Sequence, residues 1–447
     1  MSTGTSKAVD PATLTLRQTA VSILIIAGLF FIFGFVSWVN AILIPYFKIA
    51  CELETQFESY LVAFAFYISY FVMSLPASWL LRRAGFRTGM MIGLLIMSAG
   101  AFVFVPAAWW RSYPMFLSGL FTIGTGLAIL QTAANPYITI LGAREKAAQR
   151  LSIMGICNKG AGILAPLVFA AVILRATDTG LFQSLPDLSA AERSAALDEL
   201  IRRVMAPYTV VGIVLMLLAL MIRLSPLPEI DTESESEQEA DENRSRSSVL
   251  AFPHLVFGAL AIFFHVGTQV ISIDTVIGYA AGMGLDMDAA KIFPSFTLTA
   301  TIAGYLIGIS LIPKVISQRT ALRICTVLGL VLSLLIVSTS GEVDWLGLKA
   351  EVSIWFVVLL GLANSLVWAG IWPLALEGLG RYTKTGASLL IMGLCGNALM
   401  PLLYGWLADR TDLQTAYVIL IPCYLYLTWY AVHGHRLRRW TVSPRPA

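Results

Sequence analysis

The chain has 447 residues, of which 57% are hydrophobic and only 13% are charged, and its mean hydropathy is +0.77. An ordinary soluble domain carries about 25% charged residues, so this composition excludes a soluble enzyme or a secreted scaffold. The net charge of +3 is too small and too scattered for a nucleic-acid-binding protein, and neither the five cysteines nor the four histidines have the spacing of a zinc site. We therefore expect a membrane protein with no metal centre, no cofactor and no nucleic-acid partner.

Twelve apolar stretches are long enough to cross the roughly 30 Å hydrocarbon core of a bilayer, which takes about 20 helical residues. They cover residues 19–46, 58–81, 89–110, 114–141, 149–174, 207–224, 252–280, 290–315, 321–340, 353–379, 385–408 and 414–433. The first stretch is too long for the apolar region of a signal peptide and lacks a cleavage site, so we expect an uncleaved first helix. The predicted fold class is all-α and integral to the membrane, with twelve transmembrane helices in contact with the lipid bilayer.

The predicted loops differ in their content of Lys and Arg. If both termini are cytoplasmic, about two thirds of the 30 Lys and Arg residues fall on the cytoplasmic side. Because cytoplasmic loops are enriched in these residues, we expect both termini to be cytoplasmic.

An acidic segment at residues 225–250 separates spans six and seven. It holds eight carboxylates between Glu229 and Glu242 and almost no apolar residues. Such a composition favours disorder, so we expect a cytoplasmic linker, either passive or regulatory.

A second polar segment, residues 189–204, precedes span six. Ser189 and Glu192 have the spacing of a helix-capping box, and apolar residues follow at helical intervals, namely Leu197, Leu200, Ile201 and Val204. We expect a short amphipathic helix outside the membrane.

The chain contains an internal repeat. Residues 131–167 resemble residues 368–402 at an offset of 237–238, with Pro136 matching Pro373 and Cys157 matching Cys395. The matched spans cross in the same direction, which indicates a parallel repeat of six helices, as in major facilitator transporters. We expect two six-helix bundles, residues 1–224 and 251–447, that rock about a site near the membrane midplane.

Basic loops occur at equivalent places in the two repeats, at residues 82–87 and 314–319. They resemble the loops that hold the cytoplasmic side of major facilitators together. Simple enrichment of cytoplasmic loops in positive charge explains them equally well.

Polar side chains inside the spans are the candidate binding residues, because a polar group in hydrocarbon is costly unless it faces a cavity or a partner. Amides offer both donors and acceptors to hydroxyl groups, and flat aromatic rings suit the C–H face of a pyranose. A neutral, hydroxyl-rich solute fits this set, although hydrogen bonds between helices would also explain it. The candidate substrate-binding residues are Trp38, Asn40, Gln131, Asn135, Asn158, Gln269, Asn364, Trp368, Trp372 and Asn397.

Lys159 and Asp274 are the charged residues deepest within the spans, and they lie in opposite bundles. As neighbours across a central cavity they could couple transport to an ion, if protonation or cation binding at Asp274 weakened its hold on Lys159. A structural ion pair, or separate pairing with carbonyl groups, is the alternative. Glu377, at the end of span ten, could reach water or pair with Arg381 four residues later.

Several segments resemble the fucose–galactose–glucose symporter family of the major facilitator superfamily, and most closely its bacterial glucose/galactose transporter branch. These segments are residues 30–48, 131–142, 152–167, 270–280 and 384–405. The resemblance implies a sugar importer of a bacterial inner membrane, coupled to protons or sodium. Ala41 and Gln131 stand where the L-fucose–proton symporter has an aspartate and a glutamate, and Gln269 stands where many relatives have a glutamate. Asp274 is then the best remaining ion carrier.

The predicted function is alternating-access import of a glucose- or galactose-like monosaccharide, coupled to a proton or sodium gradient, by a monomeric protein. The alternatives are an uncoupled facilitator, a carrier of another small polar solute such as an amino sugar, and a non-transporting sugar sensor. No constellation of acid, base, nucleophile or metal ligands in the sequence indicates an enzyme.

Overall fold

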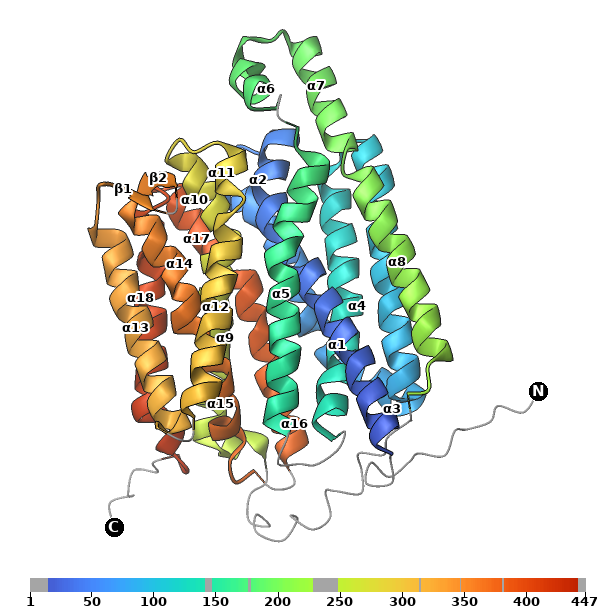
Figure 1. Ribbon diagram of the computed structural model, residues 1–447, viewed down its shortest axis with the longest axis vertical. Coiled ribbons are helices and arrows are strands. Elements are labelled where there is room, and N and C mark those ends of the chain that lie inside the picture. The colour runs from blue at the N-terminus through green and yellow to red at the C-terminus, as the bar shows by residue number, and fades with distance from the viewer. Residues whose placement is uncertain are drawn as a thin grey trace, which may run out of the picture.

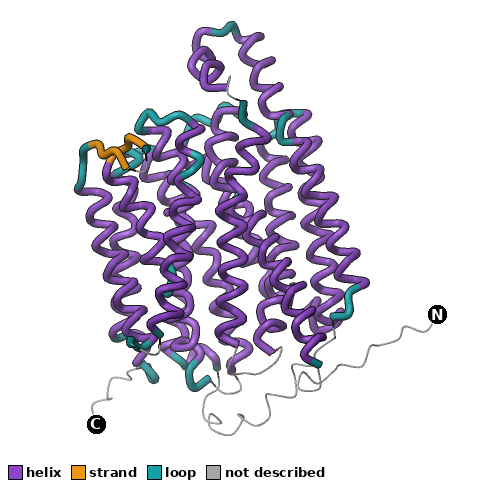
Figure 2. The backbone as a smooth tube through the Cα atoms, in the orientation of Figure 1, coloured by secondary structure: helices purple, strands orange, loops and turns teal. Residues whose placement is uncertain are grey.

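A computed structural model describes residues 15–440 except 141–146, 176–177, 228–247, 313–314, 346 and 380–381. The described chain forms a bundle of long helices whose axes are roughly aligned (Figure 1), and Figure 2 shows that nearly all of this chain is helical. Within this part of the chain, twelve segments are long and apolar enough to cross a membrane, which confirms the predicted spans. Nearly all of the predicted acidic linker and the side chain of Asn135 lie outside the described residues.

We call residues 15–227 the N-half. Its spanning helices are α1 (Leu16–Trp38), α2 (Asn40–Ala50), α3 (Gln56–Trp109), α4 (Tyr113–Ile140), α5 (Ala147–Ile173) and α8 (Met205–Leu224). Capping boxes at Thr15 and Thr55 begin α1 and α3, because each threonine side chain accepts a hydrogen bond from a backbone N–H of the first turn. Two predicted spans lie within α3, and Gly85, at a φ of 78° that favours glycine, marks the bend between them.

We call residues 248–440 the C-half. Its spans begin with α9 (Pro253–Asp274), α10 (Val276–Gly282), α12 (Phe293–Leu311) and α13 (Gln318–Ser338) and continue with α14 (Val352–Asn364), α15 (Val367–Leu376), α16 (Thr383–Met392), α17 (Gly396–Ala408) and α18 (Leu420–Val432). Short connecting elements are η4 (Val249–Ala251), α11 (Met287–Ala290), η6 (Gly393–Cys395), η7 (Thr415–Ile419) and η8 (Gly434–Arg436). An antiparallel hairpin of β1 (Glu342–Trp345) and β2 (Leu348–Glu351), which the sequence analysis did not predict, joins α13 to α14.

The two halves repeat one another in their packing as well as in their sequence. The first span of each half is broken once, at Val39 between α1 and α2 and at Thr275 between α9 and α10. Gly124 of α4 and Gly361 of α14 keep the offset of the sequence repeat, and a Cβ atom at either would lie 2.2 or 2.0 Å from a carbonyl oxygen of the neighbouring helix. Only glycine allows this close backbone approach, so both halves use the same device to pack their second and fourth spans.

The predicted short amphipathic helix is present as α7 (Ala190–Arg202), which follows α6 (Asp178–Ser184) and η3 (Leu185–Asp187). Ser189 and Glu192 form the predicted capping box, and Leu197, Leu200 and Ile201 are buried. The hydroxyl of Tyr46 in α2 donates to the backbone carbonyl of Leu200. The α6–α7 segment is therefore fastened to the first span.

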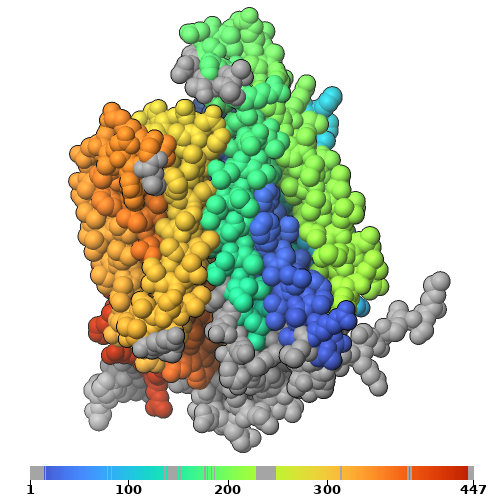
Figure 3. All heavy atoms as spheres, in the orientation of Figure 1, coloured from blue at the N-terminus to red at the C-terminus, as the bar shows by residue number. Residues whose placement is uncertain are grey.

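The bundle has two distinct ends. The α6–α7 segment and the β1–β2 hairpin lie at one end, which we call the α7 face, whereas α1 begins and α8 ends at the opposite end (Figure 1). We call that end the α1 face. Between the ends, large apolar side chains such as Leu217 and Leu220 of α8 are exposed, and Figure 3 shows α1, α5, α8, α12 and α13 along one side of the molecule. An apolar side surface of this kind suits contact with lipid.

Candidate functional site

A hydrogen bond between polar side chains joins the two halves at α5 and α9. Lys159 Nζ of α5 donates to Gln269 Oε1 of α9 over 3.3 Å. The same ammonium group lies 4.2 Å from the ring centre of Trp38 in α1, and the lysine is only 7% exposed. An amide oxygen and an aromatic face thus stabilise a buried positive charge.

Asn158 extends this set of contacts toward α1. Trp38 Nε1 donates to Asn158 Oδ1 over 3.3 Å, and Asn158 Nδ2 donates to the carbonyl of Phe30 over 3.4 Å. Four residues predicted from the sequence therefore lie in one continuous series, Asn158–Trp38–Lys159–Gln269, which we call the central cluster. It combines two amides, an ammonium group and an indole ring, and it draws on both halves.

Lys159 is not paired with Asp274. Within the described chain no ion pair joins the two, and both carboxylate oxygens of Asp274 are buried without a hydrogen-bond partner. The sequence shows that both residues lie within spans, but it does not show which residue of α9 contacts Lys159. Gln269 lies five residues before Asp274, about 7.5 Å along the helix axis, so an amine held by Gln269 is more than a turn away from the carboxylate.

Asp274 and Asn40 instead occupy the two helix breaks. Asp274 ends α9 and Asn40 begins α2, and both side chains are fully buried. The hydroxyl of Tyr67 in α3 donates to the carbonyl of Ser37 over 3.4 Å, next to the break at Val39. Helix α2 packs against both α9 and α10, so the breaks of the two halves lie near one another.

Asn364 lies within a hydrogen-bond network of the C-half. It is 1% exposed, and its Oδ1 accepts from Thr268 Oγ1 over 3.2 Å and from the Tyr424 hydroxyl over 2.9 Å. These contacts join α14 to α9 and α18. Asn364 therefore links helices to one another, which is the alternative to solute binding for an amide within a span.

Gln131 contacts a tyrosine that the sequence analysis did not include. Its Nε2 donates to the Tyr70 hydroxyl of α3 over 2.9 Å, and the Tyr67 and Tyr70 rings stack at 6.4 Å. Gln131 remains partly exposed. One hydrogen bond of the amide is thus taken, and its other groups are able to bind a solute.

Trp368 and Trp372 form an aromatic surface on α15. Their rings stack at 5.2 Å with an interplanar angle of 23°, and both side chains are partly exposed. Asn397 of α17 is also partly exposed, and its Oδ1 is buried without a partner among the described residues. Apart from Asn135, every candidate binding side chain is therefore described, but only three of them join Lys159 in the central cluster.

The residues that the sequence analysis left out of the candidate set are hydroxyl groups. Tyr70, Thr268 and Tyr424 each form a hydrogen bond with a predicted amide. Tyrosines inside an apolar span would have been a usable signal, because a buried phenol needs a hydrogen-bond partner.

Glu377 lies at the α1 face, just beyond α15. Its carboxylate accepts from Arg438 Nη2 at 2.5 Å and lies 3.8 Å from Arg319 Nη2 of the predicted basic loop. The hydrogen bond from Arg438 holds the pKa of Glu377 below its usual value. Arg381, the partner considered from the sequence, lies outside the described residues.

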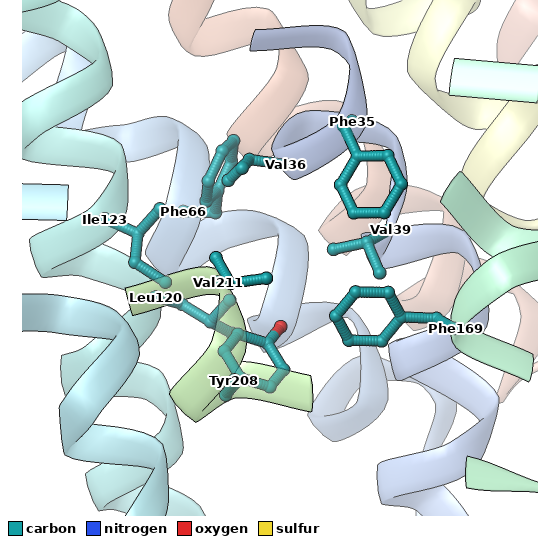
Figure 4. Close-up of a pocket in the computed structure, with 9 residues that line it drawn as sticks. All are labelled: Phe35, Val36, Val39, Phe66, Leu120, Ile123, Phe169, Tyr208 and Val211. Atoms are coloured by element: carbon teal, nitrogen blue, oxygen red, sulfur yellow. The ribbon is translucent and has the colours of Figure 1, made fainter. Parts of the chain in front are cut away.

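A small pocket lies within the N-half, next to the break at Val39 (Figure 4). Its lining is almost wholly apolar, and it has room for about one water molecule. A hydroxyl-rich solute would find too few polar partners there, so we attribute this pocket to imperfect packing. Among the described residues, no group of three His, Cys, Asp or Glu side chains could hold a metal ion.

Comparison with known proteins places this arrangement in a family. The model of the Major Facilitator Superfamily matches residues 26–394. A glucose/galactose transporter of Brucella abortus is 31% identical over 412 residues, which are 91% of this chain and 92% of the relative. The L-fucose-proton symporter of Escherichia coli is 28% identical over 420 residues, 94% of each chain.

Solved structures agree with this assignment. The crystal structure of an Escherichia coli fucose:proton symporter variant matches with a TM-score of 0.69 and 27% identity, covering 95% of this chain and 100% of that one. A D-xylose-proton symporter matches with a TM-score of 0.64 at 13% identity, over 94% of this chain and 98% of that one, which supports the fold alone. The predicted family resemblance and the prediction of a transporter rather than an enzyme are confirmed. The chain is a multi-pass membrane protein and belongs to the Major Facilitator Superfamily, as a relative of glucose/galactose transporters and of the L-fucose-proton symporter.

Proposed function

We propose that the protein imports a monosaccharide of the glucose or galactose type by alternating access, coupled to a proton or sodium gradient. The names of its relatives support a sugar as substrate. The observation that carries the proposal is the contact between Lys159 and Gln269, because it places hydrogen-bonding side chains of both halves at one point.

The central cluster has the chemistry to bind a sugar. Hydroxyl groups would accept from Lys159 and donate to or accept from the amides of Asn158 and Gln269, while Trp38 presents an aromatic face. A sugar that replaces the contact between Lys159 and Gln269 would connect the halves through its own hydroxyls.

Further candidates would complete the site from each half. Gln131 and Asn135 would add amides from α4, and Trp368 and Trp372 would add a stacking surface from α15. Asn40, Asn364 and Asn397 would contribute once movement of the halves exposes them. The partial exposure of Gln131 and of both tryptophans supports their access to a solute.

Alternating access requires the halves, residues 1–224 and 251–447 with the linker 225–250 between them, to separate at one face at a time. At the α7 face they are joined by Asp409, which accepts from the backbone N–H groups of Gln56 over 2.6 Å and Phe57 over 2.9 Å. The rings of Tyr60 and Tyr404 meet edge to face 5.6 Å apart beside this contact. The predicted loop charges assign the α7 face to the outside and the α1 face to the cytoplasm of a bacterial inner membrane.

Asp274 is the proposed ion-coupling carboxylate, because Ala41 and Gln131 cannot exchange a proton. It ends α9 of the C-half, and α9 and α10 pack against α2 of the N-half, so its surroundings change when the halves move. Lys159 would respond through Gln269, which belongs to the same helix as Asp274.

Counterflow of labelled sugars into proteoliposomes tests the function. We expect glucose or galactose to exchange, with an affinity reduced by Gln269→Leu and left unchanged by Gln18→Leu, the same change at the exposed start of α1. Exchange of no hexose, with exchange of another solute class instead, would contradict the sugar assignment. The same assay under imposed pH and sodium gradients measures the coupling.

A further inference from the structure

Four buried polar atoms at the helix breaks are left without a hydrogen bond. They are Oδ1 and Nδ2 of Asn40 and both carboxylate oxygens of Asp274, none of which has a partner in the described chain. Both residues are 0% exposed. Burying an unpaired carboxylate is among the costliest arrangements in a protein, so either a proton or a bound cation is needed to compensate its charge.

The surrounding elements bring oxygen atoms from both halves to this point. Helix α2, which begins at Asn40, packs against α9 and α10 on either side of the break that follows Asp274. The Tyr67 hydroxyl of α3 donates to the carbonyl oxygen of Ser37 over 3.4 Å, so it lies at the same break as Asn40. The carboxylate, the amide oxygen, the phenol oxygen and the backbone carbonyl therefore belong to elements that meet at the two breaks.

We propose that Asp274, Asn40 and Tyr67 bind a dehydrated sodium ion between the α1–α2 and α9–α10 breaks, with the Ser37 carbonyl as a further ligand. The site itself does not depend on the proposed function, but the role of sodium as the coupling ion does. Broken transmembrane helices supply such sites elsewhere, because their ends present polar groups at depth in the membrane.

The donor set favours a cation over a proton. A proton on Asp274 would supply one O–H donor and so satisfy one acceptor, whereas a hard cation binds several oxygens at once. The set contains one negative charge, so a monovalent cation leaves the buried site neutral. A divalent cation would leave a buried positive charge, which is unfavourable.

The position of the site gives the ion a role in the transport cycle. Asn40 and Tyr67 belong to the N-half and Asp274 to the C-half, so a bound cation stabilises the arrangement in which the α7 face is closed. Opening of that face would separate the ligands and release the ion. Binding and conformational change are then coupled by differential affinity for the two states.

Thermal unfolding of the purified full chain in nanodiscs tests the site, with sodium chloride titrated against choline chloride at constant ionic strength. We expect saturable stabilisation by sodium but not by choline. Asp274→Asn should abolish it, and Asn40→Ala should weaken the sodium affinity by about tenfold or more, as loss of a supporting ligand does. Glu342→Gln, which removes an exposed carboxylate from the β1–β2 hairpin, is the matched control and should titrate like the unmodified protein.

Asn40→Asp provides a second, independent test. A second carboxylate should shift the preference toward calcium, so this variant should gain stabilisation by calcium that the unmodified protein lacks. Monodispersity in size-exclusion chromatography and an unchanged helical circular dichroism spectrum establish that each variant is folded.

Equal stabilisation by sodium and choline, or a sodium response unchanged in Asp274→Asn, would overturn the site. A response to pH alone would also overturn it and indicate a proton carrier. Counterflow of sugar without any effect of sodium would contradict the sodium site but agree with the proposed function. Sodium binding through Asp274 without sugar transport would agree with the sodium site but contradict the sugar assignment.

Discussion

The two helix breaks share a backbone arrangement and differ in chemistry. The break of the N-half is followed by the neutral Asn40, whereas the break of the C-half is preceded by the charged Asp274. Spans four and ten differ in the same way, since Gln131 and Asn135 occupy the positions that Trp368 and Trp372 occupy in the repeat. Duplication therefore accounts for the shared geometry. Differences in residue type at equivalent positions give the N-half amides and the C-half a carboxylate and stacked aromatic rings.

The largest expected effect comes from removing the charge that distinguishes the breaks. Asp274→Asn should reduce sugar accumulation in a gradient to the equilibrium level and keep counterflow, because exchange needs no net ion movement. Uptake into proteoliposomes with and without an imposed gradient measures both. Unchanged accumulation would refute the role of Asp274.

A charge exchange sharpens this test. If both breaks contribute to one cation site, the double variant Asn40→Asp with Asp274→Asn should regain part of the accumulation lost in the single variant. Failure of the folded double variant to regain any would mean that the two breaks are not interchangeable.

Substitution of the paired glycines tests whether the halves pack equivalently. Gly124→Val and Gly361→Val should each destabilise the protein by about 1–3 kcal/mol, because the added side chain meets a backbone carbonyl. Thermal unfolding in nanodiscs measures both. Gly28→Val is the control, since no described atom lies within 4 Å of its Cβ position. A large difference between Gly124→Val and Gly361→Val would break the equivalence.

The central cluster should be sensitive to loss of its ammonium group. Lys159→Met should weaken sugar binding about tenfold, as expected for a charge-assisted hydrogen bond worth about 1.5 kcal/mol. Lys349→Met makes the same change at an exposed position of β2 and should leave binding unaltered. Equilibrium binding of labelled sugar distinguishes them, and equal affinities for all three proteins would exclude Lys159 from the site.

A smaller effect is expected where the halves meet at the α7 face. Asp409→Ala removes the acceptor at the start of α3 and should favour opening of this face by about 1 kcal/mol, the size of a helix N-cap. Distances between spin labels on α3 and α17 report the populations. An unaltered distance distribution would show that Asp409 does not hold the face closed.

The smallest effect is expected at the α1 face. The pKa of Glu377 is lowered by Arg438, so this pair stabilises the protein above the carboxyl's unfolded pKa of about 4.3 and loses its effect as pH falls through the lower folded value. Because the pair is about half exposed, Glu377→Gln should cost less than about 1 kcal/mol at neutral pH. The difference in melting temperature should vanish in acid, and a difference that persisted there would have another cause.

The spans and α7 could be predicted because their signals are local. Long apolar runs identify the spans, and Ser189 with Glu192 identifies the start of α7. The breaks could not be predicted in this way, since neither Val39 nor Thr275 is a glycine or proline and tertiary contacts set the chain direction there. The β1–β2 hairpin is short and mostly polar, and its pattern resembles that of a loop.

The site could be predicted in its residue types but not in its pairings. Lys159, Gln269, Trp38 and Asn158 follow from the rarity of polar groups in apolar spans. The choice of Gln269 over Asp274 as the partner of Lys159 depends on the depth at which α5 meets α9, which the sequence of either helix does not fix. Tyr67 and Tyr70 were overlooked because tyrosine is common in apolar cores.

The central claim is that the halves must part at the α7 face to carry a solute through. Phe57→Cys and Asp409→Cys, in a chain with its five native cysteines replaced, place one thiol on each side of that contact. We predict that a short, reducible thiol cross-linker abolishes sugar transport while sugar binding from the α1 face persists, and that reduction restores transport. Undiminished transport by the fully cross-linked protein would contradict the account.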